Sequence, residues 1–245
     1  MILNRSQSMD ASNSSKSELA YQFLLKQIVE AKIPPNAPIR IQPLGKESGL
    51  GATPIREALR QLESEKFVVM ENNRGFRAAP VTQTELADLE KCRLVVETAL
   101  MVEAMKHGDD RWEGSILSAH HLLSKAPNPT EVTDFEALRT WSERHREFHK
   151  CILSAANSPW LKLFYDQISN HLDRHFFSMF TGSHRDKYLG DDGLLSKSRS
   201  FLGIEHHTLL MNAVIERDEA KAKALLIEHV GFTREFFDEV EGKND

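Results

Sequence analysis

Helical periodicity over residues 84 to about 240, with no strand-like segment between, is the feature that most constrains how this chain can fold. Apolar residues recur there at spacings of three and four, as on the buried face of a helix. The pattern breaks at turn-forming sequences, namely Gly108-Asp109-Asp110, Pro127-Asn128-Pro129, Ser158-Pro159 and the segment from Gly182 to Gly193. About six helices result, and we expect residues 85–240 to form an all-α helical bundle.

The segment before this region predicts three helices followed by a β-hairpin. Its elements are a helix from Ser17 to the Pro34-Pro35 stop, a short helix from Pro43, a helix that starts with Thr53 as N-cap and Pro54 as first residue, and strand-like runs at 67–70 and 76–79. This order is typical of a winged helix-turn-helix. The predicted fold is therefore mainly α, with a winged helix-turn-helix at residues 18–80 and the helical bundle after it.

The remaining segments of the sequence indicate a tail, a linker and the cellular compartment of the protein. Residues 1–17 are polar and serine-rich, which predicts a disordered tail, and residues 81–84 form the expected linker. The tail lacks the apolar core of a signal peptide, and no uncharged apolar run approaches the roughly 20 residues of a membrane span. Cys92 and Cys151 both lie in apolar helical stretches, so we expect buried, inert thiols. These features favour a cytoplasmic protein without a membrane partner.

The third predicted helix carries two arginines on the face opposite its apolar stripe. Arg56 and Arg60 lie four residues apart and therefore share a helix face. In helix-turn-helix domains the first residues of this helix contact base edges, and basic groups around it contact phosphates. The candidate DNA contacts are Arg40, Thr53, Arg56, Arg60 and, on the wing, Arg74, Gly75 and Arg77. An ordinary solvent-exposed helix face has the same periodicity, and spacing alone does not distinguish the two.

The chain contains 11 histidines, and some of them have metal-ligand spacing. His145 and His149 are one helical turn apart, so both imidazoles can reach one point from the same face. His207 and His229 each lie on a later helix, and the four together can close a site inside a helical bundle. Solvent-facing histidines are the alternative, which applies equally to His171 with His175, His120 with His121, and His206 with His207.

The sequence from Thr53 to Glu63, followed by Asn73-Arg74-Gly75-Phe76, resembles the DNA-binding signature of the GntR superfamily. The helical remainder resembles the FCD effector domain of the FadR subfamily. The resemblance implies a transcription regulator that binds a near-palindromic operator as a homodimer, and a repressor rather than an activator. Members of the family commonly have an arginine two residues before the proline, where this chain has Ala52. We therefore expect its base readout to differ from that of its relatives.

The resemblance also implies a divalent metal in the helical domain. FCD domains of this type carry an Asp-x-x-x-His motif, a histidine ahead of an apolar-alanine run, and a final histidine near the end of the last helix. His149, His207 and His229 fall on the three histidine positions, and His145 stands where the aspartate would be. An all-nitrogen ligand set favours zinc, nickel or copper over manganese, and zinc or nickel is the expected ion. His206 replaces His207 if the register differs by one residue.

The expected effector is a small organic acid bound beside the metal, because many relatives regulate the catabolism of such acids. Arg93 and Arg174 are candidates for pairing its carboxylate. An ordinary salt bridge is the alternative for each arginine, and Glu97 lies at the i+4 position from Arg93.

Two other classes of protein compete with a regulator. A metal-dependent hydrolase would use the histidine cluster, but Glu147 lies two residues after His145, about 200° around the helix, and so points away from the metal face. The chain also lacks a GxSxG nucleophile motif. A non-enzymatic helical adaptor would explain the bundle but would leave the winged helix without a use. We therefore expect a regulator and no enzyme.

Overall fold

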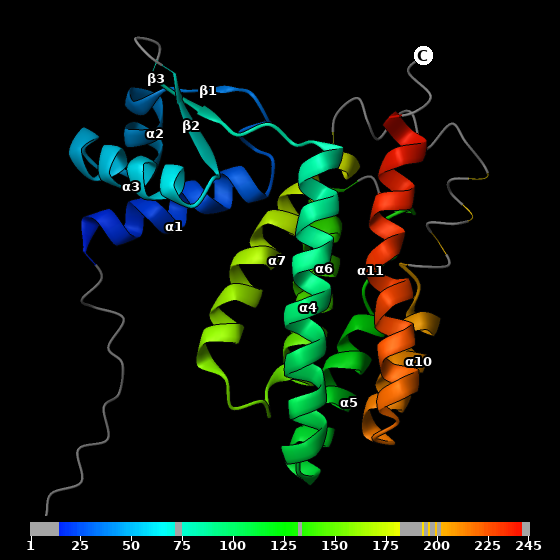
Figure 1. Cartoon of the computed structure of the whole chain (residues 1–245). Coiled ribbons are helices and arrows are strands. Elements are labelled where there is room, and N and C mark those ends of the chain that lie inside the picture. Colours follow the sequence, from blue (N-terminus) through cyan, green and yellow to red (C-terminus); the bar gives the residue numbers. More distant parts are fainter. Residues whose placement is uncertain are drawn as a thin grey trace, which may run out of the picture. The chain divides into compact units, whose positions relative to one another are not determined.

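The chain divides into two compact units, Met1–Pro80 and Val81–Asp245, and each has its own hydrophobic core. The computed structural model (Figure 1) describes residues 15–71, 75–131, 134–181 and 202–241, and residues 193, 196 and 199 singly; side chains are described up to residue 231. The mainly α fold predicted from the sequence is confirmed. Most of the predicted tail lies outside the described residues, and the first helix already begins at Lys16.

Three helices form most of the first unit: α1 (Lys16–Val29), α2 (Ile41–Ser48) and α3 (Ala52–Ser64). The predicted apolar stripe of α3 is buried and packs with α1, because Ile55, Leu59 and Leu62 are fully enclosed. The prediction that Thr53 caps α3 was wrong, because the helix begins at Ala52, two residues before the predicted first residue Pro54, and Gly51 is its N-cap. The first four N–H groups of a helix have no intrahelical partner, so Pro54 is tolerated at the third position as well as at the first.

A small antiparallel sheet completes this unit, in the order β1-β3-β2. Strands β2 (Val68–Glu71) and β3 (Gly75–Ala78) form the predicted hairpin, and Gly75 adopts φ = +85°, a conformation that favours glycine. Strand β1 (Pro38–Ile39), which the sequence did not predict, pairs with β3. The hairpin tip, residues 72–74, lies outside the described residues, and the predicted contact Arg74 lies with it.

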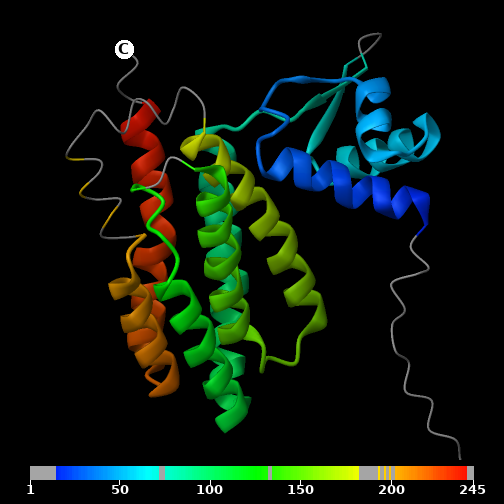
Figure 2. The same cartoon turned by 180° about the vertical axis from the view of Figure 1, so that it is seen from behind.

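The described part of the second unit is helical. Its helices are α4 (Gln83–His107), α5 (Asp110–Ser124), α6 (Phe135–Leu153), α7 (Pro159–Phe180), α10 (Ile204–Ile215) and α11 (Glu219–Glu241). Helix α4 packs against α7 and α11, and α5 packs against α6 and α10. Figure 2 shows α10 and α11 side by side on one flank of this bundle and α7 on the other. None of the described helices is long and apolar enough to cross a membrane.

Helix α4 begins inside the predicted linker and has an unusual distribution of polar residues. Thr82 is its N-cap and accepts a hydrogen bond from the backbone N–H of Glu85. The helix buries two carboxylates, Glu90 and Glu97, and exposes Cys92. The prediction of two buried thiols was therefore wrong, because α4 contacts neighbours on several faces and Cys92 lies on the remaining one; Cys151 is only half-buried.

Candidate functional site

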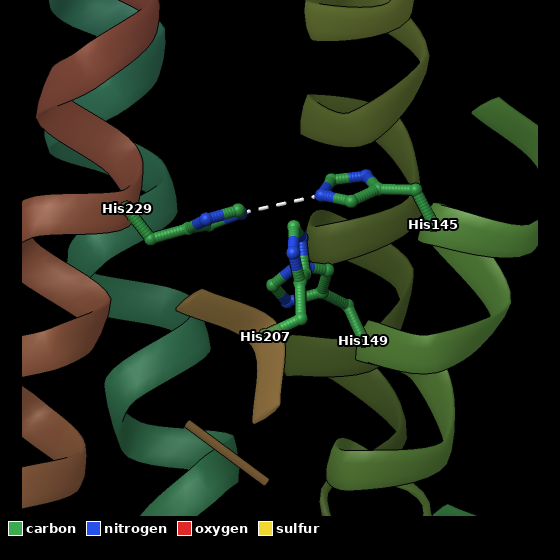
Figure 3. Close-up of side chains that lie close together, drawn as sticks. All are labelled: His145, His149, His207 and His229. Atoms are coloured by element: carbon green, nitrogen blue, oxygen red, sulfur yellow. Dashed lines mark hydrogen bonds between the residues drawn. The ribbon is translucent and has the colours of Figure 1, made fainter. Parts of the chain in front are cut away.

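Four histidines from three helices point toward one another in the bundle (Figure 3). His145 and His149 lie one turn apart on α6, whereas His207 comes from α10 and His229 from α11. One ligand nitrogen from each ring lies within 4.8 Å of the others, and the Nε2 atoms of His145 and His229 are 3.3 Å apart. The structure therefore brings together the four residues that the sequence suggested as metal ligands.

The hydrogen bonds of two rings determine which nitrogen carries the lone pair. Nδ1 of His149 lies 2.7 Å from Oε1 of Glu97, and Nδ1 of His207 lies 2.8 Å from the carbonyl oxygen of Gly203. Because both partners are acceptors, each Nδ1 carries the proton and each Nε2 carries the lone pair. Within the described residues, these two Nε2 atoms and Nδ1 of His229 are buried without a hydrogen-bond partner.

The orphaned Nε2 atoms of His149 and His207 fit a divalent cation. A buried polar atom without a partner costs about 1–3 kcal/mol, and coordination would satisfy the lone pairs of the ring nitrogens. Burial lowers the pKa of His207 to about 3 and holds the pKa values of His145 and His229 well below their usual range. The rings are therefore neutral at neutral pH, which is the state that metal coordination requires.

A buried ion pair lies behind the cluster. Oε2 of Glu97 is 2.6 Å from Nε of Arg93, and only 2% of the Glu97 side chain is exposed. Burial alone would raise the pKa of Glu97, but Arg93 and then His149 lower it to about 2, so the carboxylate is ionised. The salt bridge between Arg93 and Glu97, an alternative that the sequence left open, is confirmed and is a buried one.

Two cavities adjoin the histidines, and Arg93 lines both. One reaches His145 and His229 and has an apolar wall formed by Trp141, Leu172, Phe176, Leu202 and Val230. The other reaches His145 and His149. Arg174, the second arginine suggested for an effector, does not line either cavity. It lies 2.8 Å from Glu85, near the start of α4.

The other histidines of the bundle are placed elsewhere. His171 and His175 are buried, so the suggestion that they face solvent was wrong; His175 lies 3.0 Å from Glu85, which explains its burial. Nε2 of His206 lies 3.1 Å from the carbonyl oxygen of Leu225, and His206 is not one of the four clustered residues.

The DNA-binding face predicted on α3 is exposed. Thr53, Arg56 and Arg60 all lie at the surface, as does Arg40 at the N-cap of α2. Among the described residues neither Arg56 nor Arg60 forms an ion pair, so both guanidinium groups are available for phosphates or base edges.

The wing arginine Arg77 is already engaged within its own unit. It is half-buried, forms an ion pair of 2.9 Å with Glu71 and donates to the carbonyl oxygen of Asn36. Any contact of Arg77 with DNA would compete with these bonds.

The sequence did not indicate the contact between Glu97 and His149, which are 52 positions apart. The signal that was available is the glutamate itself, because it interrupts the largely apolar run Leu94-Val95-Val96-Glu97-Thr98-Ala99-Leu100. A carboxylate at an inward-facing position of a helix requires a partner.

Two family profiles match the chain. The FCD domain matches residues 88–232, and the bacterial regulatory proteins of the gntR family match residues 16–77. The HTH-type transcriptional repressor GlaR of Escherichia coli (strain K12) is 31% identical over 212 residues, which cover 86% of this chain and 90% of GlaR. The HTH-type transcriptional regulator BphR of Paraburkholderia xenovorans (strain LB400) is 24% identical over 214 residues, covering 87% and 81%.

Solved structures of similar fold cover nearly the whole chain. E. coli McbR/YncC superposes with a TM-score of 0.72 at 18% identity, covering 95% of this chain and 100% of that one. A GntR-type regulator from Rhodococcus sp. RHA1 superposes with a TM-score of 0.67 at 18% identity, with the same coverage. At these identities the likeness concerns the fold alone.

Proposed function

This chain belongs to the GntR family of bacterial regulatory proteins and carries an FCD domain, and from that premise we propose that it is a repressor that a small carboxylic acid releases from its operator. Membership of the family makes it a DNA-binding transcription regulator and not an enzyme. One relative is itself named a repressor. In this proposal residues 18–80 bind DNA and residues 85–240 bind the metal and the effector.

The observation that carries the proposal is the convergence of four imidazoles beside a cavity that an arginine lines. Zinc or nickel is the proposed ion, because imidazole nitrogens suit both metals. Four neutral ligands leave the ion its full double positive charge, which attracts an anion. The apolar wall of the cavity next to His145 suits the carbon skeleton of a small acid, while Glu90, Ser142 and Asp173 form a polar part of the lining.

Arg93 is the arginine that we propose for the effector carboxylate. Its Nε–H is already occupied by Glu97, and Arg93 is among the residues that line both cavities beside the histidines. Arg174 is not proposed for this role, because its guanidinium is held by Glu85 and does not line these cavities.

Operator binding is proposed to involve two copies of the chain. A two-fold symmetric dimer reads a near-palindromic operator through its two recognition helices. Effector binding then has to favour an arrangement in which the winged helix-turn-helix units of the two copies do not fit both half-sites of the operator. The effector releases DNA only to the extent that it binds this arrangement more tightly.

The proposed dimer surface is the exposed apolar face of α7. Trp160 is 70% exposed, and Leu163 and Phe164 lie beside it at helical spacing with about half of their surfaces exposed. The rings of Trp160 and Phe164 are 6.2 Å apart. A contiguous apolar patch of this kind is typical of an interface.

We expect Trp160→Asp combined with Phe164→Asp to convert the dimer into a monomer, because two carboxylates would be buried without partners at the interface. Light scattering coupled to size-exclusion chromatography measures the mass. Leu117→Asp, a substitution at an exposed position of α5, is the matched control and should leave the dimer intact. A double variant that stays dimeric at micromolar concentration refutes this choice of surface.

The regulatory proposal is tested with an operator selected from random-sequence DNA and a thermal-shift screen of mono- and dicarboxylates, with and without zinc. An acid that stabilises the zinc-loaded protein should weaken operator binding, measured by fluorescence anisotropy, by about 5–150-fold, the usual range of allosteric coupling. An acid that stabilises the protein but leaves operator affinity unchanged at saturation would remove the proposal.

A further inference from the structure

We propose that Glu97 is a positioning residue that joins the metal centre to Arg93, holding His149 in its metal-binding form and supplying negative charge from outside the ligand set. The inference rests on the proposed metal site, and it adds to that site a residue that binds neither the metal nor the effector. Glu97 lies on α4, whereas His149 lies on α6, so the contact also links two helices of the bundle.

The geometry of Glu97 shows that both of its oxygens are committed. Oε1 lies 2.7 Å from Nδ1 of His149, and Oε2 lies 2.6 Å from Nε of Arg93. The carboxylate and the imidazole are both almost completely buried, so no solvent competes for these bonds. A carboxylate held by two charge-assisted or strong hydrogen bonds has little freedom to turn.

This arrangement fixes His149 for coordination. Because Oε1 accepts the Nδ1 proton, the Nε2 lone pair has to lie on the opposite side of the ring, where the other three histidines gather. A histidine that donates to a carboxylate is also a more basic ligand, and loss of such a partner typically weakens metal binding about 10–100-fold.

The charge of Glu97 matters because the four ligands themselves are neutral. A divalent ion among four imidazoles places two positive charges in a buried site, and Arg93 adds another nearby. The ionised Glu97 carboxylate lies between Arg93 and the ligand His149, so it offsets charge on both sides. An effector carboxylate that binds Arg93 therefore acts on a cation that already contacts the metal centre through Glu97.

A second carboxylate on the same helix provides a matched control. Glu85 also accepts from one arginine and one histidine, with Nη2 of Arg174 at 2.8 Å and Nε2 of His175 at 3.0 Å. Its histidine does not belong to the four-residue cluster. Glu85→Gln therefore removes the same kind of charge from the same helix and leaves the contacts of the metal ligands intact.

The test is a zinc titration of tag-free, full-length protein that has been stripped of metal, with a competing chelator to report affinity. Glu97→Gln should weaken zinc binding about 10–100-fold, and Glu85→Gln should leave it unchanged. Equal zinc affinity of the wild type and Glu97→Gln would overturn the inference while leaving the metal site in place. A wild-type protein that binds no zinc would overturn both.

A second measurement does not depend on whether the variant folds. In the metal-free wild type, the ¹⁵N chemical shifts of the His149 ring report which nitrogen carries the proton. The inference predicts that the wild-type ring carries its proton on Nδ1 and that Nε2 is unprotonated. A wild-type ring protonated at Nε2 would overturn the role of Glu97 directly.

Discussion

Replacement of His149 by alanine is expected to remove most of the stabilisation that zinc gives to the wild-type protein. Binding to the folded state alone stabilises a protein by about 4 kcal/mol when the free ligand is at 1,000 times its Kd. His149 supplies one of four nitrogens, and its lone pair is set by the bond to Glu97. Three remaining imidazoles hold the ion far less tightly, so most of that stabilisation should disappear.

Differential scanning calorimetry with and without zinc measures this effect. His121→Ala is a suitable control, because His121 is exposed on α5 and lies outside the cluster, and it should keep the full zinc shift. The metal-free His149→Ala protein should still unfold cooperatively, since Glu97 retains its ion pair with Arg93. If zinc stabilised His149→Ala as much as the wild type, the assignment of this ligand would be wrong.

Arg56→Ala is expected to weaken operator binding about 5–150-fold, which corresponds to the roughly 1–3 kcal/mol of one good arginine contact with a base edge. The guanidinium is exposed on α3 and has no ion-pair partner among the described residues, so the substitution removes a contact with DNA without breaking one inside the protein. Ile55 and Leu59, which hold α3 in its core, are untouched.

Fluorescence anisotropy at several salt concentrations distinguishes base contacts from phosphate contacts. Loss of a phosphate contact lowers the slope of log K against log salt by about one, whereas loss of a base contact relaxes sequence preference instead. Arg111→Ala, at an exposed position of α5 in the other unit, should leave both quantities as in the wild type. Unchanged affinity and unchanged salt dependence in Arg56→Ala would mean that α3 is not the recognition helix.

Local patterns in the sequence predicted the local structure of the first unit well, and the exceptions have physical reasons. The stripe of Ile55, Leu59 and Leu62 requires only helical spacing, and it is buried. Strand β1 has two residues, too few to show an alternating pattern, and it exists through its pairing with the distant strand β3. The start of α3 was misplaced by two residues because a proline is accepted anywhere in the first turn.

The candidate site was only partly accessible to the same reasoning. The spacing of His145 and His149 places both on one face of any helix. His207 and His229 were candidates from their positions on later helices, and the family resemblance supported them as ligands. Whether an arginine lines the cavity beside the histidines depends on how the helices pack. Arg93 lines it, whereas Arg174 is paired with Glu85 and does not. The bond between Glu97 and His149 joins two helices, so no local pattern encodes it.

Elemental analysis measures directly whether the four clustered histidines hold a divalent ion. Tag-free wild-type protein, equilibrated with zinc and then desalted, should carry one divalent ion per chain, and His149→Ala treated in the same way should carry none. Wild-type protein without stoichiometric metal, or equal metal content in the two proteins, would contradict the account.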